Sequence, residues 1–240
     1  GVGKTTTSVN LAASLAASGK RILLVDLDPQ ANATMGSGTN KQTLKTTIYH
    51  VLLGDAAIQA ARITGTQGKY DLIPANRDLA GAEVEMVDLP QREARLKAAL
   101  EAIGHDYDYI LIDCPPALNL LTLNGLCAAH AVMIPMQCEY YALEGLSDLV
   151  NTIKRVRNNF NPTLRIEGLL RTMFDPRNIL AQQVSDQLQK HFGDKVYRTV
   201  IPRNIRLAEA PGFGLPALYH DGQSKGALAY LELAKEILDA

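Results

Sequence analysis

Apolar and polar positions along this chain follow two periods, one typical of helices and one typical of buried strands. Helical spacing of apolar residues predicts helices, and short runs of branched apolar residues predict strands covered on both faces. The predicted helices are Thr5–Ser18, Arg92–Ile103, Leu143–Asn158, Asn178–Phe192 and Lys225–Leu238. The predicted strands are Arg21–Asp26, Tyr70–Pro74, Tyr109–Asp113, Ala131–Pro135, Ile166–Met173 and Val196–Ile201. Residues 31–40, rich in Gly, Thr and Asn, are predicted to form a loop.

The order of these elements predicts the fold class. Strands that alternate with helices of this length indicate βαβ units, and therefore an α/β fold with a mostly parallel, twisted sheet and helices on both faces. No internal repeat or low-complexity linker interrupts the sequence, so residues 1–240 are predicted to form a single domain.

The first residues, Gly1-Val-Gly-Lys-Thr-Thr-Thr7, match the second half of a phosphate-binding loop, G-x-x-x-x-G-K-[ST]. In such a loop Lys4 would reach the β- and γ-phosphates of a nucleotide, and the Thr5 hydroxyl would ligate Mg²⁺. A phosphate loop normally lies between a strand and a helix. We therefore expect a first strand before Gly1 in the parent protein, and a gap in the sheet of this chain where that strand is missing.

Two acidic motifs follow predicted buried strands, where ligands of open α/β sheets bind. The first is Val25-Asp-Leu-Asp-Pro-Gln30, in which either Asp26 or Asp28 can aim at the γ-phosphate and orient a water. The second ends in Asp113, which would join the Mg²⁺ shell in a Walker B arrangement. An Asp at a strand end is often only a helix cap. Together with Lys4 and Thr5, however, these acids indicate a P-loop NTPase site.

The composition is typical of a globular domain. Hydrophobic residues make up 47% and charged residues 20%, as in ordinary globular domains, and the net charge is -1. Residues 151–215 hold eleven Lys/Arg against five Asp/Glu, a net of +6, which suggests an anionic partner; a solvated helical face is the alternative.

The three cysteines, Cys114, Cys127 and Cys138, lack disulfide or zinc spacing and indicate a reducing, cytoplasmic compartment. No apolar run is long enough to predict a membrane span.

Beyond these motifs, the chain resembles the ParA/Soj chromosome- and plasmid-partitioning ATPases, relatives of MinD with a deviant Walker A loop. The resemblance is carried by Gly1–Asn10, Leu24–Thr34, Tyr107–Leu123, Ile134–Leu149, Leu170–Arg177 and Val200–Gly214. It implies a cytoplasmic, nucleoid-associated ATPase with weak intrinsic activity that binds ATP and Mg²⁺. It also implies an ATP-bound homodimer, nonspecific binding of DNA by that dimer, and hydrolysis stimulated by a ParB/Spo0J-like partner.

The resemblance also assigns roles by position. The cofactor contacts implied near the phosphates are Gly1, Val2, Gly3, Lys4, Thr5 and Thr6, with Thr5 also on the Mg²⁺. Asp28 would support hydrolysis and Asp113 would be the Walker B acid, so Lys4, Asp28 and Asp113 form the implied catalytic set. Pro202 and Asn204 resemble the loop that contacts the base, and Arg177 and Arg206 match positions that bind DNA.

One departure from the family pattern concerns its signature lysine. That lysine crosses the dimer to the partner's phosphates, and it would lie two positions before Gly1. The resemblance therefore leaves open whether a fragment without this lysine and the first strand hydrolyses ATP.

Two alternative functions remain at this point. A MinD-like membrane switch needs a basic amphipathic C-terminal helix, but residues 230–240 hold two Glu and one Asp against one Lys. We expect Leu231, Ala234 and Leu238 to pack on the core instead, so no membrane partner is predicted. A non-catalytic nucleotide-binding scaffold is the other alternative. Lys4, Thr5, Asp28 and Asp113 oppose it for the parent protein, and it stays open for the fragment.

Overall fold

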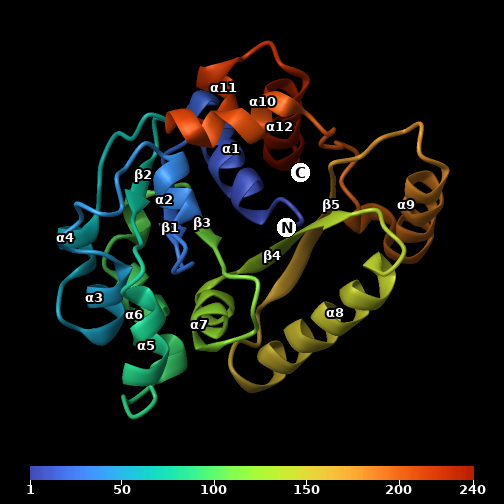
Figure 1. Ribbon diagram of the computed structural model, residues 1–240. Helices are drawn as coiled ribbons and strands as arrows, with labels where there is room; N and C mark the ends of the chain where they lie inside the picture. The colour runs from blue at the N-terminus through green and yellow to red at the C-terminus, as the bar shows by residue number, and fades with distance from the viewer.

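The computed structural model describes all 240 residues, and Figure 1 shows helices packed around strands that run through the middle of the molecule. The strands are β1 (Ile22–Asp26), β2 (Asp71–Ile73), β3 (Tyr109–Asp113), β4 (Ala131–Gln137) and β5 (Arg165–Thr172). The α-helices are α1 (Lys4–Ala17), α2 (Asn32–Gly36), α3 (Ile48–Leu53), α4 (Ile58–Ala61), α5 (Leu79–Glu85), α6 (Arg95–Glu101), α7 (Leu120–Ala128), α8 (Ala142–Asn159), α9 (Ile179–Phe192), α10 (Ile205–Glu209), α11 (Ala217–His220) and α12 (Lys225–Leu238). Four 3₁₀ turns complete the chain: η1 (Arg92–Ala94), η2 (Gly104–Asp106), η3 (Gly193–Lys195) and η4 (Ala210–Phe213).

The strands form two parallel sheets, with orders β2-β1-β3 and β4-β5. No ladder joins β3 to β4, and the N-terminus lies close to β4 in the view of Figure 1. In the first sheet β1 and β3 are in register at their carboxyl ends, where Asp26 pairs with Asp113. Parallel pairing therefore brings the two acidic motifs to the same edge of the sheet.

Helices cover both faces of the strands, as the sequence predicts. On one face α1 and α12 pack against Leu24 of β1 and Leu170 of β5. On the other face α3, α5 and α6 pack against Leu23 and Val25 of β1. The second sheet has a further core, in which α8 and α9 pack on Leu169 of β5. Successive residues of a strand point to opposite faces, so each strand serves two cores.

Most predicted elements are present, but two predictions are wrong. Residues 31–40 are not entirely loop, because α2 forms within them after Ala31 adopts a left-handed conformation, with φ 55°. Residues 196–201 do not form a strand; only isolated bridges join Val196 to Leu169 and Pro202 to Phe174. The reason is that the backbone N–H groups of residues 198 and 199 point to a side chain of α12 and not to β5.

The C-terminal helix α12 packs on α1 through a buried face that includes Tyr230, Leu233 and Ala234. Ala234 is buried and the partly exposed Leu238 packs against the core, as expected, whereas Leu231 is partly exposed and does not belong to that core. No helix of the structure is both long and apolar enough to cross a membrane.

Polar side chains of α1 join this helix to the C-terminal part of the chain. Thr7 Oγ1 and the Tyr230 hydroxyl lie 2.9 Å apart in a buried hydrogen bond. The Asn10 amide oxygen accepts the backbone N–H of Ala217 at 2.7 Å and so caps the first turn of α11. These two hydrogen bonds therefore hold the segment from α10 to α12 against α1, the helix that begins at the phosphate loop.

Candidate functional site

The first turn of α1 presents unpaired backbone donors. Gly3 precedes the helix in a left-handed conformation, with φ 84°, which glycine adopts without steric cost. The first helical hydrogen bond runs from Thr7 N to Gly3 O at 2.9 Å, and the N–H groups of Lys4, Thr5 and Thr6 have no backbone acceptor. Free N–H groups at the positive end of a 14-residue helix attract an anion such as a phosphate.

Asp113 lies beside this turn, at the end of β3. Its side chain is almost fully buried, at 1% exposure. Asp113 Oδ2 accepts the Thr5 hydroxyl at 2.8 Å, and Oδ1 accepts the Ser8 hydroxyl at 2.9 Å. Burial raises the pKa of Asp113 to about 6, against the lowering effect of the two hydroxyl hydrogen bonds and of Lys4. The carboxylate is thus desolvated and held next to Thr5, where a cation would stabilise it.

Asp26 lies opposite Asp113, but both of its carboxylate oxygens already accept hydrogen bonds from the surrounding chain. It is fully buried, and its Oδ2 accepts both the backbone N–H (2.9 Å) and the hydroxyl (2.7 Å) of Thr34. Its Oδ1 accepts the backbone N–H of Asp28 at 3.0 Å. Burial, with the charge of Asp113, raises the pKa of Asp26 to about 7.

Asp28 is the acid of this motif that remains free for another partner. It is partly exposed, and only its Oδ1 is engaged, by the backbone N–H of Gln30 at 2.9 Å. Its negative charge contributes to the raised pKa of Asp113, so the two carboxylates face the same region. Of the two acids that the sequence left open, the structure therefore leaves Asp28 available to orient a water molecule.

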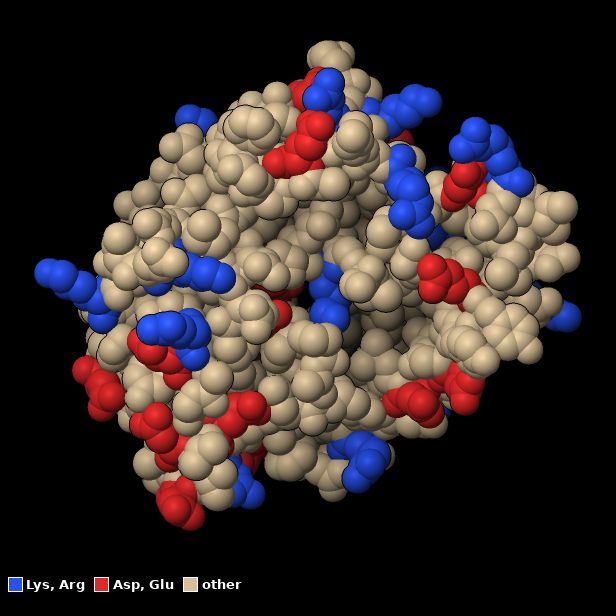
Figure 2. Space-filling model, in the orientation of Figure 1, with Lys and Arg blue, Asp and Glu red and all other residues tan.

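The donor set fits Mg²⁺, the cation expected from the motif. Thr5 Oγ1 and the Asp113 carboxylate are hard oxygen ligands that already touch each other. Mg²⁺ uses one or two protein oxygens together with phosphates and waters, which matches two protein ligands beside a phosphate-binding turn. Figure 2 shows a hollow near the middle of the molecular face, in which atoms of basic and acidic side chains lie side by side.

The second sheet contributes one residue that the sequence did not indicate. Thr172, at the end of β5, donates its hydroxyl to the Val2 carbonyl (2.8 Å) and lies within 3.2 Å of the Met136 carbonyl. Its methyl and hydroxyl also lie close to Gly3, where a Cβ would be 3.6 Å away. Thr172 therefore joins the phosphate loop to the β4-β5 sheet.

The predicted base-contacting residues lie on the segment that leads into α10. Pro202 pairs with Phe174, two residues beyond β5, and Asn204 caps α10 by accepting the backbone N–H of Arg206 at 3.1 Å. Ser8 and Thr34, like Thr172, were not predicted. Ser8 could have been found, because it lies on the same helical face as Thr5, one turn later. Thr34 and Thr172 carry no local signal.

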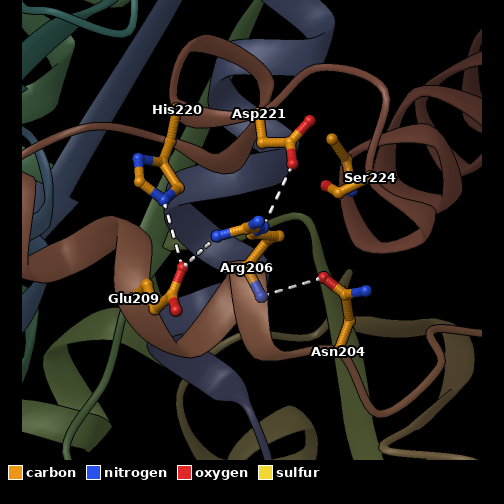
Figure 3. A network of polar contacts seen from close by, with 7 residues as sticks. Asn204, Arg206, Glu209, His220, Asp221 and Ser224 are labelled. Atoms are coloured by element: carbon orange, nitrogen blue, oxygen red, sulfur yellow. Dashed lines mark hydrogen bonds and ion pairs between the residues drawn. The ribbon is translucent and has the colours of Figure 1, made fainter.

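The two arginines expected to bind DNA lie apart in sequence and are paired with acids. Figure 3 shows Arg206 between Glu209 and Asp221, with ion pairs of 2.8 Å and 3.1 Å, and His220 beside Glu209. Arg206 keeps 47% of its side chain exposed. Arg177 is 89% exposed and pairs with Asp175 at 2.9 Å. Exposed ion pairs of this kind are weak, about 0–1 kcal/mol, and a phosphate can displace them.

Lys and Arg side chains gather on the upper right of the face in Figure 2, over the segments that lead into α9 and α10. The three cysteines are free thiols, with Cys127 and Cys138 buried in the core and Cys114 partly buried. Burial raises the pKa of Cys127 to about 11, which keeps this thiol protonated. The cysteines thus act as small packing residues.

A phosphate-binding turn, a buried acid beside its Thr, and a parallel sheet with helices on both faces together define a P-loop nucleoside-triphosphate-binding protein. A family model described as "AAA domain" (AAA_31) matches residues 1–166. The sporulation initiation inhibitor protein Soj of Bacillus subtilis is 55% identical over 237 residues, covering 99% of this chain and 94% of that protein. The chromosome partitioning protein ParA of Caulobacter vibrioides is 50% identical over 240 residues, covering 99% of this chain and 90% of that protein. The chain belongs to the ParA/Soj family of chromosome-partitioning ATPases.

Solved structures agree with this fold. A cobyrinic acid a,c-diamide synthase from Mycobacterium smegmatis, crystallised with an ATP analog and magnesium, superposes with a TM-score of 0.87 at 39% identity. The alignment covers 99% of this chain and 90% of that chain. The fold expected from the sequence is therefore confirmed as an α/β P-loop architecture.

Proposed function

We propose that this chain binds ATP with Mg²⁺, hydrolyses it slowly, and uses the nucleotide state to control nonspecific DNA binding during chromosome or plasmid partitioning. The observation that carries the proposal is the contact between the Thr5 hydroxyl and the buried Asp113 carboxylate at the start of α1. The membership of this chain in a family of chromosome-partitioning ATPases supports the role in partitioning. In this proposal an ATP-bound homodimer binds DNA, and a ParB/Spo0J-like partner stimulates hydrolysis.

The residues divide the chemical task between them. The N–H groups of Lys4, Thr5 and Thr6, with the Lys4 ammonium, bind and orient the phosphates. Thr5 and Asp113 would hold Mg²⁺, which when bound would supply positive charge to neutralise the phosphates. Asp28 accepts a hydrogen bond from the attacking water through the oxygen that Gln30 leaves free. Pro202 and Asn204 contact the base.

DNA binding is assigned to the basic segment, residues 151–215. Arg177 and Arg206 are exposed enough to reach phosphates once they leave their acidic partners. Contacts of this kind depend on salt and carry no sequence information, which suits nonspecific binding.

The decisive experiment measures ATPase activity of the full-length protein with DNA, with and without its ParB-like partner. We expect DNA and the partner together to raise turnover. The Asp28→Ala variant should bind ATP with unchanged affinity but hydrolyse it about a hundredfold more slowly, the effect of losing a positioned proton acceptor. Asp148→Ala, an exposed position on α8, is the matched control. Wild-type turnover by Asp28→Ala would reject the role of Asp28, and absence of ATP binding by the wild type would reject the proposed function.

A further inference from the structure

The segment between η3 and α10 runs along β5 without forming a strand. The backbone N–H of Tyr197 donates to Leu169 O at 3.0 Å, and the N–H of Ile201 donates to Arg171 O at 2.9 Å. Four steps along the segment therefore match only two steps along β5. The two additional residues are accommodated as a bulge at residues 198–200, which interrupts the ladder.

Two charged side chains of opposite sign hold the peptide groups of this bulge. Arg171 Nη2 donates to the carbonyls of Tyr197 (2.7 Å) and Arg198 (3.3 Å). Glu236 of α12 accepts the N–H groups of Arg198 (2.7 Å) and Thr199 (2.9 Å) on its two carboxylate oxygens. Polar groups that would be left unpaired by the broken ladder are thus satisfied from both sides.

This arrangement carries an energetic cost. Arg171 is only 8% exposed and has no carboxylate within ion-pair distance; its other partner is the Ser185 hydroxyl at 2.9 Å, and its Nε has none. Burial lowers the pKa of Arg171. Burial alone would raise the pKa of Glu236, but hydrogen bonding from Thr199 and Arg198 outweighs it and leaves this pKa lowered. A buried charge without a counter-ion is unfavourable. An ordinary backbone ladder would avoid this cost, so we expect a role of Arg171 and Glu236 beyond stabilising the chain.

The bulge lies where both parts of the candidate nucleotide site join β5. Thr172, next to Arg171, holds the phosphate loop through the Val2 carbonyl. Two residues further, the N–H of Phe174 donates to Ile201 O at 3.1 Å, directly before Pro202. A slip of the segment by one residue would move Pro202 by about 3.3 Å relative to the phosphate loop.

We propose that Arg171 and Glu236 are positioning residues that fix the register of the 196–202 segment on β5. They thereby set the distance between the phosphate loop and the base-contacting pair Pro202 and Asn204, and so determine selectivity for the nucleotide base. The inference rests on the proposed function, because it takes Pro202 and Asn204 as base contacts. It predicts that disturbing the bulge changes recognition of the base and leaves recognition of the phosphates unchanged.

The test uses Glu236→Gln and Arg171→Lys in the full-length protein, with Glu232→Gln, one turn earlier on the exposed side of α12, as control. Dissociation constants are measured for ATP, GTP and inorganic tripolyphosphate, and thermal unfolding checks that each variant is folded. Gln keeps the size of Glu but replaces one acceptor oxygen by a donor. We expect Glu236→Gln and Arg171→Lys to reduce the preference for ATP over GTP by about fivefold, the equivalent of one hydrogen bond. Tripolyphosphate binding should not change, and Glu232→Gln should behave as the wild type.

The outcomes separate the inference from the proposed function. An equal loss of affinity for all three ligands, or an unchanged ATP preference in both folded variants, would overturn the positioning role while the ATPase assignment stands. A wild type that binds ATP and GTP equally would reject base selectivity at this segment. A wild type that binds none of the three would reject the proposed function itself, and the inference with it. Because the two variants act from different elements, misfolding of one leaves the other as the test.

Discussion

Replacing Asp26 by Asn should destabilise the folded chain at acid pH and stabilise it above neutral pH. Asp26 is fully buried, and its pKa is raised from 3.8 to about 7, so the folded chain favours the protonated acid. The stability contributed by this group is complete below pH 3.8 and is lost as the pH rises through about 7. A difference of about three between the two pKa values corresponds to about 4 kcal/mol.

Asn is neutral at every pH, and its geometry sets the remaining cost. Its amide oxygen can accept the Thr34 N–H and hydroxyl, as Asp26 Oδ2 does. Its amide NH₂ then opposes the backbone N–H of Asp28 and loses that hydrogen bond, at a cost of about 1 kcal/mol. The variant should therefore be less stable than the wild type by about 1 kcal/mol near pH 4 and more stable by about 3 kcal/mol near pH 8.

The assay is urea unfolding without nucleotide and with EDTA, at several pH values between 4.5 and 8, for the wild type and Asp26→Asn. Asp148→Asn, at an exposed position of α8, is the control and should follow the wild type at each pH. If the difference in free energy of unfolding between Asp26→Asn and the wild type stays constant across this range, the raised pKa of Asp26 is refuted.

Three further predictions concern the loop, the core and the surface. Thr172→Val removes the hydrogen bond to the phosphate loop and should weaken ATP binding about fivefold by calorimetry; unchanged affinity would show that the loop holds its shape alone. Gly125→Ala places a Cβ 2.7 Å from a cysteine sulfur and should lower the free energy of unfolding by about 1–3 kcal/mol, whereas Gly104→Ala, with open space around it, should not. Arg177→Glu with Arg206→Glu should reduce the slope of log affinity for DNA against log salt by about 2 and leave ATP binding intact, measured by filter binding; an unchanged slope would remove both arginines from the phosphate contacts.

The sequence predicts this fold and site well where the signal is local. Branched apolar runs mark β1 and β3, and each ends in an acid, so parallel pairing places Asp26 opposite Asp113. The Gly-Lys-Thr start of α1 predicts a phosphate-binding turn, and the structure brings Thr5 into contact with Asp113. These features depend on period, strand end and residue type, all of which can be read from a few consecutive residues.

Features that depend on distant partners could not be predicted. Residues 196–201 have the composition of a strand, yet Arg171 and Glu236, which lie far from each other in sequence, hold them in a bulge. Thr172 has no motif around it, and its role comes from the approach of Val2, which lies 170 residues away. For residues 196–201 tertiary contacts override local propensity, and for Thr172 the role depends on a contact that no local pattern records.

Helix α1 has consequences for how freely its sequence can vary. Thr5 and Ser8 face Asp113 on one side, while Thr7 and Asn10 bind the C-terminal segment on another. Its apolar residues fill the core between the sheets and α12. Small polar residues in a helix are usually the ones that mutation can exchange without penalty. Here Thr5, Thr7, Ser8 and Asn10 each have a hydrogen-bond partner, so a saturation mutagenesis screen should find α1 the least tolerant helix of the chain, with these four polar positions as restricted as its alanines.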